Sequence, residues 1–156
     1  MSEERGLDLL LWRHAEAVDG FPDAARTLSP RGERQAERMA AWLDQHAPKD
    51  LRVVVSPATR TRQTVAPLQR EHEISAQVGT DASAEDVLSA AGWPDANGAV
   101  LIVGHQPTLG QVAATLLGQP GADISFKKGA LWWFRVRERF GVRETVLRAV
   151  IPAELV

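Results

Sequence analysis

The sequence contains no cysteine, which excludes disulfide scaffolds, thiolate-bound zinc sites and thiol nucleophiles. It also lacks a long apolar run near its start, where acidic residues precede a short hydrophobic stretch. A secretory signal begins instead with positive charge, and a membrane helix needs about 20 mainly apolar residues. We therefore expect neither a signal peptide nor a membrane partner, and we predict a cytoplasmic protein.

An excess of either charge is also missing. The 156 residues include 18 Lys and Arg against 20 Asp and Glu, a formal net charge of −2. Proteins that hold nucleic acid through its phosphates are usually basic, so we expect no nucleic-acid partner. The hydrophobic share of 44% against 24% charged is typical of a folded globular protein. The length suits one domain, which we predict to cover residues 1–156.

Short apolar runs alternate with segments that favour helices. The three strongest predicted strands are residues 9–12, 51–55 and 99–103. The predicted helices are residues 30–46, 57–70, 83–91 and 108–117, and two weaker features are a strand at 75–79 and a closing hairpin of 131–136 with 145–151. Alternating strands and helices predict an α/β fold with three α/β/α layers and a mainly parallel central sheet.

Polar side chains follow each of the three strongest strands. Arg13 and His14 follow the first, Arg60 lies just after the second, and His105 follows the third. Ligands of parallel α/β sheets bind beyond the carboxyl ends of the strands. We therefore expect these four side chains to meet at one edge of the sheet.

Two guanidinium groups and two imidazoles form a better anion pocket than a metal site. An arginine donates hydrogen bonds in a fork that matches a tetrahedral oxyanion, and the first turn of the helix expected from Pro57 would add backbone N–H groups. An imidazole can attack a phosphoryl group and form a covalent intermediate. A zinc site made of His14, Glu16 and His105 lacks tight ligand spacing, so we predict no metal and no cofactor.

Four motifs in this order resemble the histidine phosphatase superfamily, whose fold is phosphoglycerate mutase-like, and within it the small bacterial phosphohistidine phosphatases of the SixA type. The motifs are Arg13-His14-Ala15, Arg26-Thr27-Leu28-Ser29-Pro30-Arg31-Gly32, Ser56-Pro57-Ala58-Thr59-Arg60-Thr61-Arg62-Gln63-Thr64 and Gly104-His105-Gln106-Pro107. The resemblance covers nearly the whole chain.

The resemblance implies a role for each residue at the predicted edge. His14 would be the nucleophile that is transiently phosphorylated, while Arg13, Arg60 and His105 would bind and stabilise the phosphoryl oxygens. Arg62 lies about 200° around the helix from Arg60 and should not share this role. Larger family members also protonate an alcohol leaving group with a carboxylic acid, and Asp81 is the candidate for such a proton donor here.

The resemblance and the weak acid signal together favour phosphohistidine on a phosphotransfer protein as substrate. The P–N bond of phosphohistidine is weak, and its leaving group needs little help from an acid. The chain also lacks a long insertion that could form a lid over a small molecule. A small-molecule phosphomonoesterase of the same fold and a non-catalytic phospho-binding module are the alternatives, and a nucleophile at His14 separates the enzymes from the module.

Overall fold

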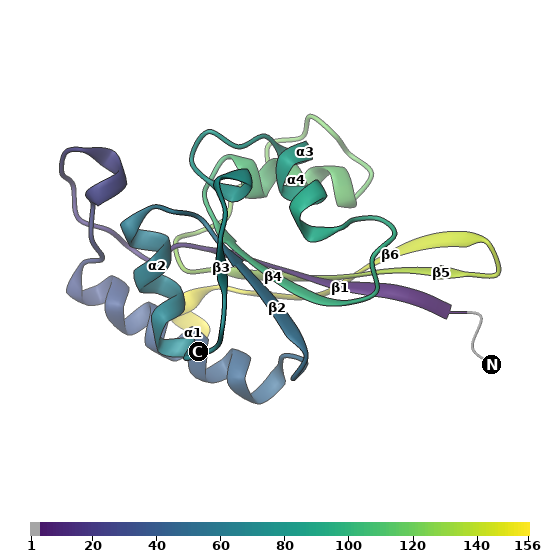
Figure 1. The fold of residues 1–156 in the computed structure, drawn as a ribbon, viewed down its shortest axis with the longest axis horizontal. Coiled ribbons are helices and arrows are strands. Elements are labelled where there is room, and N and C mark those ends of the chain that lie inside the picture. The colour runs from purple at the N-terminus through teal and green to yellow at the C-terminus, as the bar shows by residue number, and fades with distance from the viewer. Residues whose placement is uncertain (1–3) are drawn as a thin grey trace.

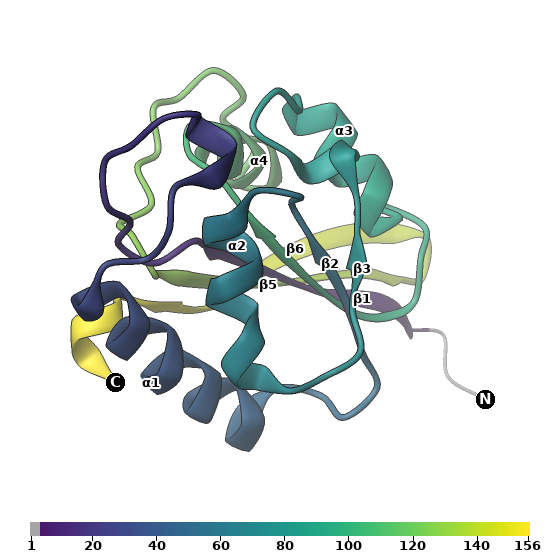
Figure 2. The same cartoon turned by 60° about the vertical axis from the view of Figure 1, so that its left-hand side comes forward.

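The computed structural model describes residues 4–156 and is built around a six-stranded sheet (Figures 1 and 2). Its strands are β1 (Glu4–Arg13), β2 (Leu51–Val55), β3 (Glu73–Ile74), β4 (Gly98–Gly104), β5 (Leu131–Arg139) and β6 (Val142–Ile151). They lie side by side in the order β3-β2-β4-β1-β5-β6. The first four are mutually parallel, whereas β5 runs antiparallel to β1 and β6 antiparallel to β5. The predicted α/β fold is confirmed. Residues 1–3, part of the segment from which no signal peptide was predicted, lie outside the described residues.

Helices cover both faces of the sheet. The helices α1 (Pro30–His46) and α2 (Thr59–Val65) lie on one face, and α3 (Ala84–Ala91) and α4 (Thr108–Leu116) lie on the other (Figures 1 and 2). The buried strand β1 serves both layers, because alternate side chains of a strand point to opposite faces. Leu9 and Leu11 pack with the core under α3 and α4, whereas Leu10 and Trp12 pack with the core under α1. No helix within residues 4–156 is long and apolar enough to cross a membrane.

Two predicted elements on the β2 side of the sheet differ from the structure. The helix expected over 57–70 is α2, which ends at Val65 and continues as a short 3-10 helix over Ala66–Leu68, because Pro67 has no N–H to continue the α-helical pattern. The strand expected over 75–79 is wrong. The edge strand is Glu73–Ile74, after which the Ser75 side chain accepts a hydrogen bond from the N–H of Gln77 and starts a 3-10 turn.

The closing hairpin is longer than expected. The charged segment between its predicted strands belongs mostly to β5 and β6, which are joined by a tight turn at Phe140 and Gly141, both with positive φ. Opposite charges face each other across the hairpin, as where Arg137 Nε donates to a Glu144 carboxylate oxygen at 3.0 Å. Cross-strand pairs of this kind stabilise strands whose side chains are polar, and the alternation of apolar residues does not reveal them.

Candidate active site

The carboxyl ends of β1, β2 and β4 bring the four predicted site residues together. The backbone N–H of His14 donates to the carbonyl of Gly104 at 3.1 Å, next to His105. The rings of His14 and His105 lie 5.4 Å apart between centroids. Arg60 Nη2 lies 3.5 Å from His105 Nδ1, and Arg13 directly precedes His14. The cluster predicted from the strand ends is therefore present as a group.

The environment of His14 suits a nucleophile. Its Nδ1 lies 2.8 Å from the carbonyl oxygen of Ala15, and because a carbonyl can only accept, Nδ1 carries the proton and Nε2 keeps its lone pair. Burial lowers the pKa of His14 to about 4, and the like charges of Arg13 and Arg60 act in the same direction, against the raising effect of the Ala15 hydrogen bond. The imidazole is thus neutral near neutral pH.

His105 is held in the opposite tautomer. Its Nε2 lies 2.7 Å from the hydroxyl oxygen of Ser56, and its Nδ1 faces a guanidinium nitrogen of Arg60 that can only donate. The proton therefore lies on Nε2 and is donated to Ser56 Oγ. Burial, followed by the positive charge of Arg60, lowers the pKa of His105 to about 3. Both histidines are neutral, so the net positive charge of the cluster comes from the arginines.

Each of the two arginines has a buried donor without a partner. Arg13 Nη1 donates to the carbonyl of Phe126 at 2.6 Å, and Arg60 donates to Asp23 through Nη1 and Nη2. The Nε atoms of both arginines are buried and have no hydrogen-bond partner among residues 4–156. A buried donor left unpaired costs about 1–3 kcal/mol or more when charged. Such a pair of donors is the signature of a site that accepts an anion.

The structure also places Asp23 in this cluster, a residue that lies outside the four motifs. Its main-chain oxygen and its Oδ2 accept from Arg60 at 2.9 and 3.1 Å. Hydrogen bonding to Arg26 is the largest of several effects that lower the pKa of Asp23. The only available signal in the sequence is an aspartate three residues before Arg26 of the second motif. A buried cation in the first turn of a helix, such as Arg60, is unfavourable unless an anion pairs with it. In this structure the carboxylate of Asp23 is that anion.

Other motif residues support the site without reaching it. The Ala15 N–H donates to Thr64 Oγ1 at 3.0 Å, and the Leu28 N–H donates to Gln63 Oε1 at 2.7 Å. A Cβ on Gly32 would collide with the carbonyl oxygen of Glu16, so this glycine allows α1 to approach the segment after His14. These contacts explain why the motifs extend beyond the four central side chains.

The expected contribution of a helix N-terminus needs correction. The helix α2 begins at Thr59 instead of Pro57. Pro57 has no N–H, and the N–H of Ala58 donates to Ser56 Oγ at 3.3 Å. Arg60 is buried in the first turn of α2 whereas Arg62 is exposed, as the helical geometry predicts.

Asp81 lies at the edge of the site. It lines a pocket of about 240 Å³ that Ser56 also lines, and Ser56 holds His105. Asp81 is exposed, and no hydrogen bond joins it to the four central side chains in the described part of the chain. Within residues 4–156, no group of three or more His, Asp or Glu side chains is arranged to hold a metal ion.

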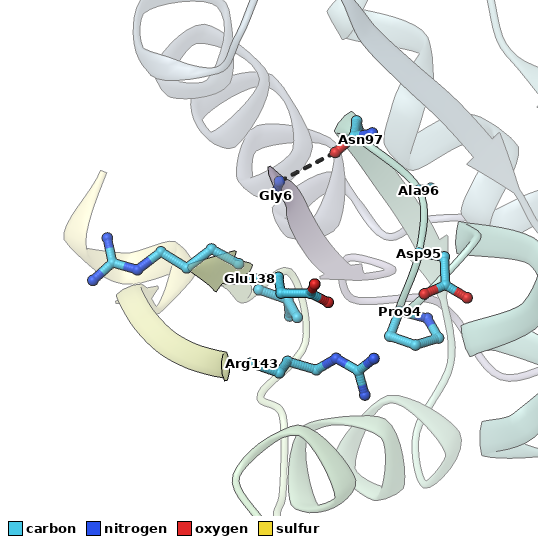
Figure 3. A pocket seen from close by; sticks show the side chains of 9 residues that line it. Gly6, Pro94, Asp95, Ala96, Asn97, Glu138 and Arg143 are labelled. Carbon is cyan, nitrogen blue, oxygen red and sulfur yellow. Dashed lines mark hydrogen bonds between the residues drawn. The ribbon is translucent and has the colours of Figure 1, made fainter. Parts of the chain in front are cut away.

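A second pocket, of about 180 Å³, lies at the opposite end of β1 (Figure 3). Its wall includes Gly6, Asp95, Asn97, Glu138 and Arg143. The N–H of Gly6 donates to the Asn97 side chain at 3.2 Å. None of the predicted site residues lines this pocket.

Comparisons with known proteins agree on one family. The sequence model of the histidine phosphatase superfamily (branch 1) matches residues 9–87. An uncharacterised protein of Mycobacterium tuberculosis is 32% identical over 142 residues, which cover 82% of this chain and 80% of that protein. A phosphohistidine phosphatase SixA homolog of Haemophilus influenzae is 30% identical over 136 residues, which cover 77% of this chain and 82% of that protein. The structure of a SixA-type protein of Nakamurella multipartitia superposes with a TM-score of 0.74 at 27% identity, covering 94% of this chain and 96% of that one.

Proposed function

The chain belongs to the histidine phosphatase superfamily (branch 1), and from that premise we propose that it dephosphorylates phosphohistidine on a phosphotransfer protein through a covalent intermediate on His14. The observation that carries this proposal is the state of the His14 imidazole. It is neutral, its Nδ1 proton is held by the Ala15 carbonyl at 2.8 Å, and its Nε2 lone pair is therefore available beside two guanidinium groups.

The reaction proceeds in two displacements at phosphorus. In the first, Nε2 of His14 forms a bond to phosphorus while the P–N bond of the substrate breaks, and the departing imidazole takes up a proton from solvent. In the second, water attacks phosphorus, the bond to Nε2 breaks, and inorganic phosphate leaves with His14 neutral again. Arg13 and Arg60 stabilise the charge on the equatorial oxygens through their unpaired Nε–H groups. No step uses a metal ion.

Two observations favour phosphohistidine over a phosphoester. Asp81, the candidate proton donor, lies at the edge of the site, so an alkoxide leaving group would receive little direct help. A relative at 30% identity carries the name phosphohistidine phosphatase SixA homolog. We therefore assign Asp81 a role as proton donor only for ester substrates, and we take a cytoplasmic phosphotransfer protein as the partner.

Trapping of the intermediate tests the mechanism. The purified protein is mixed with a ³²P-labelled histidine phosphotransfer domain and quenched in alkaline detergent, and the label on this chain is assayed for loss in acid and retention in alkali. We expect such a label on the wild-type protein and on His72→Ala, which removes an exposed histidine. His14→Ala should carry no label and lose at least about 10³-fold in turnover. An active His14→Ala protein contradicts the covalent mechanism.

The same assay separates the alternatives. Rapid turnover of small phosphomonoesters without any action on the phosphotransfer domain would favour a small-molecule phosphatase. Binding of the phosphorylated domain without turnover or label would favour a phospho-binding module. Retention of full activity in excess chelator is expected, because no step of the proposed reaction requires a metal.

A further inference from the structure

The contact between Asp23 and Arg60 joins the surface of the protein to a buried cation. Asp23 begins a short 3-10 helix over Asp23–Ala25, in the loop that lies beside the start of α2 (Figure 2). Its side chain is 60% exposed, whereas that of Arg60 is only 6% exposed. A carboxylate on a surface loop thus binds a guanidinium group inside the site.

The atoms used in this contact leave one edge of Arg60 available. A guanidinium group can donate in a forked manner from its Nη1–Nη2 edge or from its Nε–Nη2 edge. The main-chain oxygen of Asp23 accepts from Nη1 at 2.9 Å, and its carboxylate Oδ2 accepts from Nη2 at 3.1 Å. Nε remains buried and without a partner among residues 4–156, and Nη2 lies 3.5 Å from His105.

From this geometry we propose that Asp23 is a positioning residue for the reaction. By holding Nη2 at the outer edge of Arg60, its carboxylate fixes the guanidinium group so that the unpaired Nε–H faces the phosphoryl group. The residue acts through Arg60 and does not touch the reacting atoms. This inference rests on the phosphatase reaction proposed above and extends it to a residue outside the four central side chains.

Asp23 is itself held in place. Its Oδ1 accepts from Arg26 Nη1 at 3.2 Å, and Arg26 Nε donates to the carbonyl of Val18 at 2.9 Å. Both carboxylate oxygens of Asp23 are therefore engaged, one by each arginine. An ionised carboxylate paired with two cations is a poor proton donor, so the arrangement suits orientation of Arg60 and does not suit acid catalysis.

The opposite role would be competition. A carboxylate on Arg60 could occupy the place of a phosphoryl oxygen, and removal of Asp23 would then strengthen anion binding. Positioning predicts the reverse, because a guanidinium group held by the main-chain oxygen alone is less ordered and must be ordered further when the anion binds. The sign of the change in anion affinity therefore separates the two roles.

Direct anion binding provides the test, with orthovanadate as the probe and isothermal titration as the measurement. We expect Asp23→Ala to bind orthovanadate about tenfold more weakly and to lose a similar factor in kcat/KM, in a protein that still folds because the main-chain oxygen of Asp23 continues to accept from Arg60 Nη1. Asp23→Asn, which keeps an acceptor, should fall between. Asp19→Ala removes an exposed carboxylate from the same loop and should match the wild type.

A double-mutant cycle tests whether the effect passes through Arg60. In an Arg60→Ala background, Asp23→Ala should cause no further loss of orthovanadate affinity. Additive losses, tighter binding by Asp23→Ala, or an equal loss in Asp19→Ala would each overturn the positioning role. A wild-type protein that binds orthovanadate with this dependence but forms no phosphoenzyme would instead contradict the proposed function and leave this inference intact.

Discussion

The two ends of β1 carry arginines in opposite circumstances. At the carboxyl end, Arg13 and Arg60 each keep a buried Nε without a partner in the described residues. At the amino end, Arg143 lies 6.0 Å from the centre of the Trp93 ring, and its pocket also contains the carboxylates of Asp95 and Glu138 (Figure 3). The indole N–H of Trp93 is also buried and has no hydrogen-bond partner among residues 4–156, but it is a neutral donor.

This difference shows that a pocket alone does not indicate an anion-binding site. The amino-end pocket is enclosed by side chains whose charges offset one another, so an anion would gain little there. The carboxyl-end cluster instead combines two cations with two neutral imidazoles and one carboxylate, that of Asp23, and burial lowers the pKa of both histidines. The parallel strands all end at this edge of the sheet, so the polar side chains that follow them lie close together there.

Removal of one arginine at each end of β1 gives the largest expected contrast. Arg60→Ala should lower kcat by about 10²–10³-fold, the usual cost of removing one donor aimed at transition-state charge. Arg143→Ala, the matched variant at the other end, should stay within about twofold of the wild type. Steady-state kinetics on the phosphorylated phosphotransfer domain measures both, and equal losses in the two variants would refute the contrast.

The buried histidines should make the protein less stable in mild acid. The pKa values of His14 and His105 are lowered from 6.5 to about 4 and about 3, so between these values and 6.5 the unfolded chain binds more protons than the folded one. The free energy of unfolding therefore falls as the pH drops from 6.5 towards 4, by about 3 kcal/mol for His14 alone at about 1.4 kcal/mol per pKa unit.

Urea unfolding between pH 4 and 7 measures this dependence. His14→Asn should remove part of the slope, whereas His72→Asn, which removes an exposed histidine, should not change it. A slope that is unaffected by His14→Asn would show that the buried imidazole is not the source.

The smallest expected effect concerns the edge of the site and depends on the leaving group. Asp81→Asn should lower the hydrolysis of glycerol phosphate, whose alkoxide leaving group needs a proton, by about tenfold, below the range of about 10²–10⁴ for a well-placed general acid. Hydrolysis of phosphohistidine should change by less than about twofold. Glu85→Gln is the matched control from the same exposed segment. An equal loss on both substrates would exclude a role limited to esters.

Local patterns in the sequence are sufficient to predict much of the fold. The helix α1 follows the expected boundaries because Ser29 accepts the Gly32 N–H at 3.0 Å and Pro30 suits the first helical position. The strands β2 and β4 follow from short β-branched and aliphatic runs. Elements that depend on tertiary partners were less predictable. The edge strand Glu73–Ile74 has only the end of β2 to pair with, and the charged part of the hairpin depends on cross-strand ion pairs.

The sequence alone determined that Arg13, His14, Arg60 and His105 meet, because each strong strand is followed within a few residues by a cation or a histidine and parallel strands end at the same edge of the sheet. The tertiary structure alone decided how these side chains are held. Asp23 and Arg60 are 37 residues apart in the chain, and Ser56 and His105 are 49 apart. Contacts over such separations leave no periodic signal, yet they determine the tautomer of His105 and the donor of Arg60 that remains available to an anion.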